Sequence, residues 1–111
     1  MTCFERRLLA HLTQLFPTPM DRTDPVVQRQ LVRHFVERAQ HWGWGVEAQV
    51  AAYAELAMRL HPRFDEHPDF GWAHEILQDE YIVSHDLRWQ TLEAAAARHI
   101  ARRPPAAEID S

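Results

Sequence analysis

Eight histidines in 111 residues make metal binding the first chemistry to examine. His61 and His67 stand in the stretch LHPRFDEHPDFGW, residues 60–72, and together with Asp65 they would be the ligands of a loop metal site. Two ligands on one helix should lie three or four positions apart, as in HExxH, and no two histidines here have that spacing. We therefore expect solvated or locally capping histidines, and no bound metal or other cofactor.

Nucleophilic and acid–base catalysis also lack a matching set of residues. Cys3 lies at the start of the chain, Ser84 is better placed to cap a helix, and the sequence contains neither a GxSxG elbow nor a glycine-rich phosphate loop. Adjacent carboxylates such as Asp65 and Glu66 point in different directions, and an acid–base role would require burial. We predict that the protein is not an enzyme and has no catalytic residue, with a small metal-dependent enzyme as an alternative.

Composition indicates a folded, cytoplasmic protein. The length fits one domain, and 46% apolar residues with four tryptophans supply enough apolar surface for a core. A single cysteine excludes an internal disulfide, the first residues do not resemble a secretory signal, and no apolar run is long enough to span a membrane. We predict one helical domain over 1–103, a frayed tail over 104–111, and no membrane partner.

Charge is distributed unevenly along the chain. Residues 41–93 contain three arginines against ten acidic residues, and all twelve basic residues of the protein are arginines. An acidic middle works against a phosphate-binding face. We therefore expect no nucleic-acid partner.

Apolar periodicity and capping signals predict five helices. Thr2 and Glu5 have the spacing of a capping box, Asp24 precedes a proline at a first helical position, and Ser84 is a third cap. Helices are expected over 3–16, 25–41 and 46–60, a short one over 72–79 capped by Asp69, and a last one over 85–102. The predicted fold class is all-α, a small bundle of four main helices plus one short helix.

Aromatic residues concentrate at two joints between these helices. In HWGWG, residues 41–45, glycines let the backbone turn while Trp42 and Trp44 are available either for the core or for an exposed binding surface. In the connector 60–72, Phe64 and Trp72 are expected to fasten the chain to the core. The sequence leaves open which aromatics are exposed.

One segment carries a family resemblance. Residues 45–77 follow the pattern of an alanine-rich helix and then, in order, Leu60, Pro62, Phe64, Asp65, Pro68, Trp72, Ala73, Ile76 and Leu77. This segment resembles small bacterial proteins encoded near type VI secretion spike proteins and their toxic effectors. The glycine usual before the first proline is His61 here, which argues against His61 as a ligand. The resemblance implies a helper of a secreted toxin that acts by protein binding, and it assigns no catalytic residue.

These observations predict a non-catalytic accessory factor, an adaptor or chaperone-like protein that binds a type VI secretion effector or spike protein. The alternative is an immunity protein that inhibits a cognate toxin, in which the acidic stretch 65–80 covers a basic active site. The sequence leaves the partner and the oligomeric state open. The predicted partner-binding residues are Trp42, Trp44, Asp65, Glu66, Asp69, Phe70 and Trp72.

Overall fold

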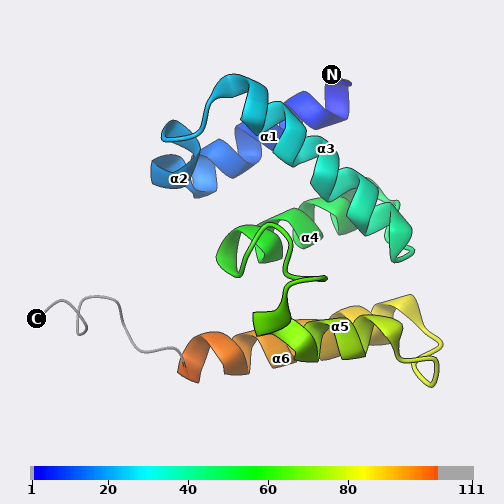
Figure 1. The fold of residues 1–111 in the computed structure, drawn as a ribbon. Helices are drawn as coiled ribbons and strands as arrows, with labels where there is room; N and C mark the ends of the chain where they lie inside the picture. The colour runs from blue at the N-terminus through cyan, green and yellow to red at the C-terminus, as the bar shows by residue number, and fades with distance from the viewer. Residues whose placement is uncertain (1, 103–111) are drawn as a thin grey trace, which may run out of the picture. The chain divides into compact units, whose positions relative to one another are not determined.

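The computed structural model describes residues 2–102, and over this range the chain is all-α, without a strand (Figure 1). The elements in chain order are α1 (Cys3–Leu15), α2 (Pro17–Asp21), α3 (Pro25–His41), α4 (Glu47–Arg59), the 3₁₀ helix η1 (Pro68–Phe70), α5 (Gly71–Gln78) and α6 (His85–Arg102). The predicted class, with four main helices and a short one, is confirmed. The tail expected over 104–111 lies outside the described residues.

Helix α2 was not expected from the sequence. Pro17 lacks an amide hydrogen and ends α1, as predicted, but a proline also fits the first position of a helix, where the amide would have no partner. The chain therefore starts a new helix at the residue that ends the previous one. Met20, on α2, is fully buried.

Contacts along the chain divide it into two compact units, an N-terminal unit over 1–64 and a C-terminal unit over 65–111. The boundary falls inside the connector 60–72. The expectation of a single domain remains a prediction. The two units are described separately below.

In the N-terminal unit, α1 packs against α2, α3 and α4, and α3 packs against α4. On α3 the buried side chains are Val32, Phe35 and Ala39, whereas Val27 is exposed. The core of the unit is apolar and rich in aromatic rings; its buried side chains are Leu8, Leu12, Met20, Val32, Phe35, Ala39, Trp44, Val50, Tyr53, Ala54, Leu56, Ala57 and Phe64.

Helix ends in this unit are closed by the predicted caps. The Thr2 hydroxyl accepts the Glu5 amide at 3.1 Å, and the Glu5 carboxylate accepts the Thr2 amide at 2.8 Å, which is a complete capping box. Asp24 accepts the Val26 amide at 2.8 Å, ahead of Pro25 at the first helical position. These bonds explain why the predicted starts of α1 and α3 are correct.

The C-terminal unit consists of η1, α5 and α6, with α5 packed against α6. Its buried apolar side chains are Phe70, Ala73, Leu77, Leu92 and Ala96. Ser84 caps α6 as predicted, accepting the Leu87 amide at 3.2 Å. The predicted cap at Asp69 is wrong: the N-cap of α5 is Phe70, which makes no side-chain cap bond, and Asp69 lies inside η1. The cap of η1 is His67, whose Nδ1 accepts the Asp69 amide at 3.1 Å.

Candidate protein-binding surface

The two His-Pro dipeptides of the connector form the same local turn. Nδ1 of His61 accepts the Arg63 amide at 3.0 Å, and Nδ1 of His67 accepts the Asp69 amide, each two residues further on. An imidazole nitrogen that accepts a backbone hydrogen has its lone pair engaged and carries no proton. Both histidines therefore act as local caps, one of the two roles that the sequence predicted.

Two further histidines hydrogen-bond to backbone carbonyls. His34 Nε2 lies 3.2 Å from the Pro62 oxygen in the N-terminal unit, and His74 Nδ1 lies 3.0 Å from the Asp65 oxygen in the C-terminal unit. Within residues 2–102, no group of three or more His, Cys, Asp or Glu side chains is arranged to hold a metal ion. The loop site considered for His61, Asp65 and His67 is not assembled.

The joint HWGWG places its two tryptophans in different environments. Gly43 adopts φ 93°, and beyond it the Trp44 amide reaches back to the Ala39 carbonyl at 2.8 Å while the Gly43 amide reaches Gln40 at 3.0 Å. This pair of bonds is a Schellman motif, which carries the second residue after the cap inward against the helix. Trp44 is consequently 1% exposed, with its ring 6.1 Å from that of Tyr53.

Trp42, the cap residue of the same motif, stays half-buried at the surface. The Arg38 guanidinium lies 5.6 Å from its ring centroid, and the His41 ring packs edge-on at 4.7 Å. Of the two predicted tryptophans, only Trp42 offers surface to a partner in this conformation. Partner binding by Trp44 remains a prediction that its burial disfavours.

The other predicted residues lie at the start of the C-terminal unit. Asp65 is 0% exposed and Phe70 is buried, whereas Glu66 and Asp69 are exposed. The expected acidic face of the connector therefore consists of Glu66 and Asp69 alone. Direct binding by Asp65 and Phe70 stays a prediction that this conformation does not favour.

Phe70 and Trp72 attach η1 and α5 to α6 through a histidine. Their rings lie 5.3 Å and 5.5 Å from the ring of His99, and 6.3 Å from each other. Aromatic pairs at such separations add to the free energy of burial. Within the C-terminal unit Trp72 thus packs against His99 of α6, in line with its predicted fastening role, and the residue as a whole is half-buried.

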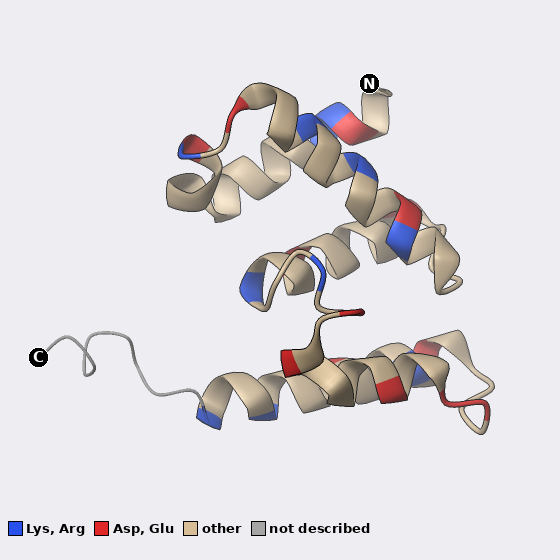
Figure 2. Ribbon diagram, in the orientation of Figure 1, with Lys and Arg blue, Asp and Glu red and all other residues tan. Residues whose placement is uncertain are grey.

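The two units differ in their content of charged residues (Figure 2). The described part of the N-terminal unit contains eight arginines and six acidic residues, and that of the C-terminal unit contains three arginines and eight acidic residues. Six of the eight acidic side chains in the C-terminal unit are exposed; they are Glu66, Asp69, Glu75, Glu80, Asp86 and Glu93. The acidic surface that the sequence predicted is thus concentrated in this unit.

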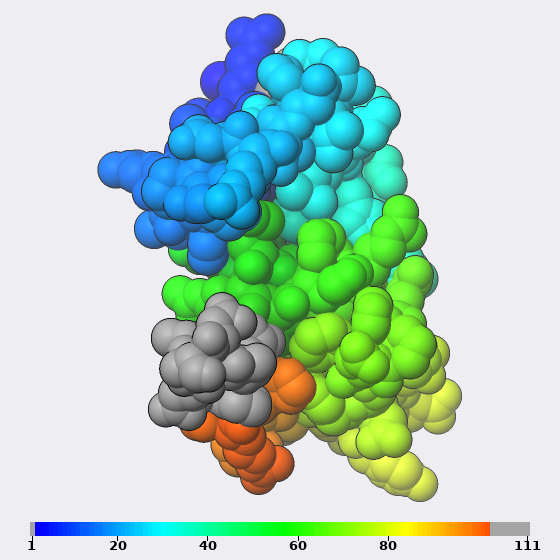
Figure 3. Space-filling view, turned by 60° about the vertical axis from the view of Figure 1, so that its left-hand side comes forward, coloured from blue at the N-terminus to red at the C-terminus, as the bar shows by residue number. Residues whose placement is uncertain are grey.

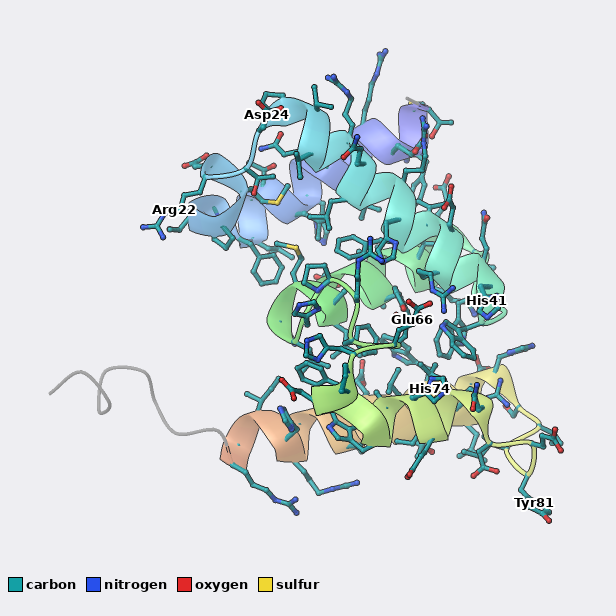
Figure 4. All side chains as sticks on the ribbon, viewed as in Figure 1. Arg22, Asp24, His41, Glu66, His74 and Tyr81 are labelled. Atoms are coloured by element: carbon teal, nitrogen blue, oxygen red, sulfur yellow. The ribbon has the colours of Figure 1, made fainter. Side chains whose placement is uncertain are left out.

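The loop between α5 and α6 carries an exposed apolar group that the sequence interpretation missed. Tyr81 is 96% exposed and Val83 is 88% exposed, and Leu87, on the first turn of α6, is also exposed. Figure 4 shows the Tyr81 side chain pointing away from the loop. A signal was present for Tyr81 and Val83, because in the segment DEYIVSHD, residues 79–86, they stand between helix signals and outside any helical apolar stripe.

Two surface hollows, one in each unit, are small. One of about 230 Å³ is lined by Glu5, Val26, Arg29, Gln30 and Arg33, and another of about 180 Å³ by Trp72, Ala95, Arg98, His99 and Arg102. Both lie below the range of roughly 300–1,000 Å³ that is usual for small-molecule sites. The exposed apolar side chains near the α5–α6 loop and the excess acidic charge of the C-terminal unit are the surface features that bear on protein binding.

Comparisons with protein-family models, curated proteins and solved structures found no match to this chain. In the described part of the chain, none of the helices is long and apolar enough to cross a membrane.

Proposed function

We propose that the protein is a non-catalytic binding factor that recognises another protein through its C-terminal unit. The observation that supports this most is the combination of excess acidic charge with the exposed apolar side chains Tyr81, Val83 and Leu87 in that unit. Charged groups around an apolar centre speed association and select a complementary partner. The proposed partner therefore has a basic surface.

The resemblance of residues 45–77 supports a more specific proposal, an adaptor or chaperone-like factor for a type VI secretion effector or spike protein in the cytoplasm. The basic active site of a toxin would fit the same acidic surface, so an immunity protein remains the second candidate. In both cases Glu66 and Asp69 are the exposed acidic residues of the connector.

Affinity purification of the full chain from the bacterium that encodes it, followed by mass spectrometry, identifies the partner. Co-expression then separates the two candidates. An immunity protein rescues cells from its cognate toxin, whereas an adaptor restores secretion of its effector without rescue. Binding that persists only to nucleic acid, or no specific protein at all, would contradict the proposal.

A charge variant tests whether the acidic surface makes the contact. Changing Glu66, Asp69, Glu80 and Asp86 to the corresponding amides should weaken capture of the identified partner by about tenfold or more at low salt, because complementary charge is lost. The matched control changes the exposed Asp21 and Glu37 of the N-terminal unit in the same way and should bind as the wild type. Equal binding by both variants would contradict the assignment.

A further inference from the structure

We propose that the α5–α6 loop, residues 79–84, is a preorganised anchor whose Tyr81 side chain inserts into an apolar pocket edged by Arg or Lys on the partner protein. This inference rests on the proposed function, and it adds a site and a partner chemistry that the predicted residues do not include. The loop is shown in yellow at the surface in Figure 3.

Arg88 fixes the conformation of the loop. From the first turns of α6 its Nη2 donates to the Ile82 carbonyl at 2.6 Å and to the Asp79 carbonyl at 3.1 Å. One guanidinium thus ties both ends of the loop to the following helix. Bonds from a charged donor are stronger than those between neutral groups, so the loop resists rearrangement.

The backbone of the loop is closed by its own residues as well. The Asp79 carboxylate accepts the Tyr81 amide at 2.9 Å, an Asx turn, and the Asp79 carbonyl accepts the Ile82 amide at 3.3 Å. Ile82 is half-buried, whereas its neighbours Tyr81 and Val83 are exposed. The half-buried isoleucine thus lies between two residues whose side chains are exposed.

An exposed tyrosine on a preordered loop is well suited to anchor a partner protein. Much of the cost of binding comes from ordering loops and side chains, and that cost falls when the loop is already fixed. Tyrosine adds a large contact area with few rotatable bonds and is enriched among residues that dominate interface energy. Val83 and Leu87 extend the apolar contact on either side of Ser84.

The charges around the loop specify the rim of the partner's pocket. Glu80 and Asp86 are exposed beside Tyr81 and Val83, and no arginine lies between positions 79 and 87. A pocket with acidic edges would be repelled, and a neutral pocket would leave these carboxylates desolvated without a partner. Cationic edges therefore fit the loop best.

The experiment uses the full chain and the partner identified by affinity purification. Tyr81 is replaced by photoreactive benzoylphenylalanine, and the crosslinked peptide of the partner is mapped. The affinity of the purified partner is then measured for Tyr81→Ala and Val83→Ala, with Val46→Ala as control, because Val46 is 63% exposed but lies in the N-terminal unit. Circular dichroism confirms that each variant remains folded.

We expect a crosslink to a peptide rich in Arg or Lys, a loss of affinity of at least about 30-fold for Tyr81→Ala, and wild-type affinity for the control. Unchanged affinity for Tyr81→Ala and Val83→Ala would overturn the inference while leaving the proposed function standing. A crosslink only to a second copy of this chain would also overturn it. Failure of the wild type to bind any specific protein would overturn both proposals.

Discussion

The two tyrosines of the protein, one in each unit, lie in opposite environments. In the N-terminal unit, Trp44 and Phe64 are buried on either side of Tyr53, with ring centroids 6.1 Å and 5.2 Å from that of the tyrosine. In the C-terminal unit, Tyr81 is held almost fully exposed by a loop that Arg88 stabilises. One tyrosine thus stabilises a core, and the other is available at the surface for the recognition that we propose.

The largest predicted effect follows from removing an aromatic ring from the N-terminal core. Trp44→Ala should lower the free energy of unfolding by about 3–5 kcal/mol, because it leaves a cavity in a packed interior. Chemical denaturation measures this. Tyr81→Ala is the matched change in the C-terminal unit and should alter the free energy by no more than about 0.5 kcal/mol. Comparable losses of unfolding free energy in Trp44→Ala and Tyr81→Ala would contradict the difference between buried and exposed aromatic side chains.

Replacing glycine by alanine should change the stability of the protein in opposite directions at two positions. Gly43→Ala should destabilise the protein by about 1–2 kcal/mol, because a side chain is strained at φ 93°. Gly71→Ala should stabilise it by about 0.5–1 kcal/mol, because Gly71 has φ −55° at the start of α5 and the added methyl group has no neighbour within 4 Å. Thermal unfolding of the two variants should shift in opposite directions. A shift of the same sign in both would show that backbone conformation does not govern these positions.

The capping box makes the stability of the N-terminal unit depend on pH. The bonds from the Thr2 amide and hydroxyl, and next the nearby Arg33 guanidinium, lower the pKa of Glu5, although partial burial opposes them. A lowered pKa stabilises the fold above the ordinary glutamate value of about 4.3, and this contribution is lost as pH falls through the lower folded value.

Thr2→Ala removes the hydroxyl but keeps the Thr2 amide, which is the larger cause, so it should raise the pKa of Glu5 only part of the way toward its ordinary value. It should reduce the free energy of unfolding at neutral pH by about 1 kcal/mol. NMR titration of the Glu5 carboxyl and denaturation at pH 7 measure the two effects. Thr18→Ala, an exposed threonine in α2 of the same unit, is the control. An unchanged Glu5 titration in Thr2→Ala would show that the Thr2 hydroxyl does not contribute to the lowered pKa.

The smallest effect on stability is expected from a substitution that loosens the α5–α6 loop of the C-terminal unit. Arg88→Gln shortens the side chain, so its donors no longer reach the carbonyls of Asp79 and Ile82. Hydrogen exchange at residues 80–83 should accelerate while α6 remains helical. Partner affinity should fall by about three- to tenfold through the cost of reordering the loop. Loop exchange as slow as in the wild type would contradict the preorganisation of Tyr81.

Helix positions were predicted well where capping chemistry is local. The bounds of α3 are correct because Asp24, Pro25 and Gly43 mark both ends within a few residues. Helix α2 was missed because Pro17 both ends one helix and starts the next, and only its role as a helix end was considered. The cap predicted at Asp69 is wrong because η1 precedes α5, so Asp69 lies inside a helical turn and α5 begins after Phe70 without a side-chain cap.

Exposure of the candidate site was harder to predict. Trp42 and Trp44 are two positions apart in sequence, and only the backbone path through the Schellman motif determines which is buried. The sequence marks Asp65 as one more acidic residue of a polar connector, yet the fold buries it. Tyr81 was overlooked because the hydrogen bond that holds its loop comes from Arg88, seven residues later. Local sequence patterns do not reveal that bond.

The assignment of recognition to the C-terminal unit is tested most directly by one affinity comparison. The dissociation constant of the purified partner is measured side by side for Tyr81→Ala and Trp42→Ala, the exposed aromatic of one unit and the half-buried aromatic of the other. We predict a loss of at least about 30-fold for Tyr81→Ala and less than about threefold for Trp42→Ala. The reverse order would place the anchor at the HWGWG joint of the N-terminal unit and contradict our assignment.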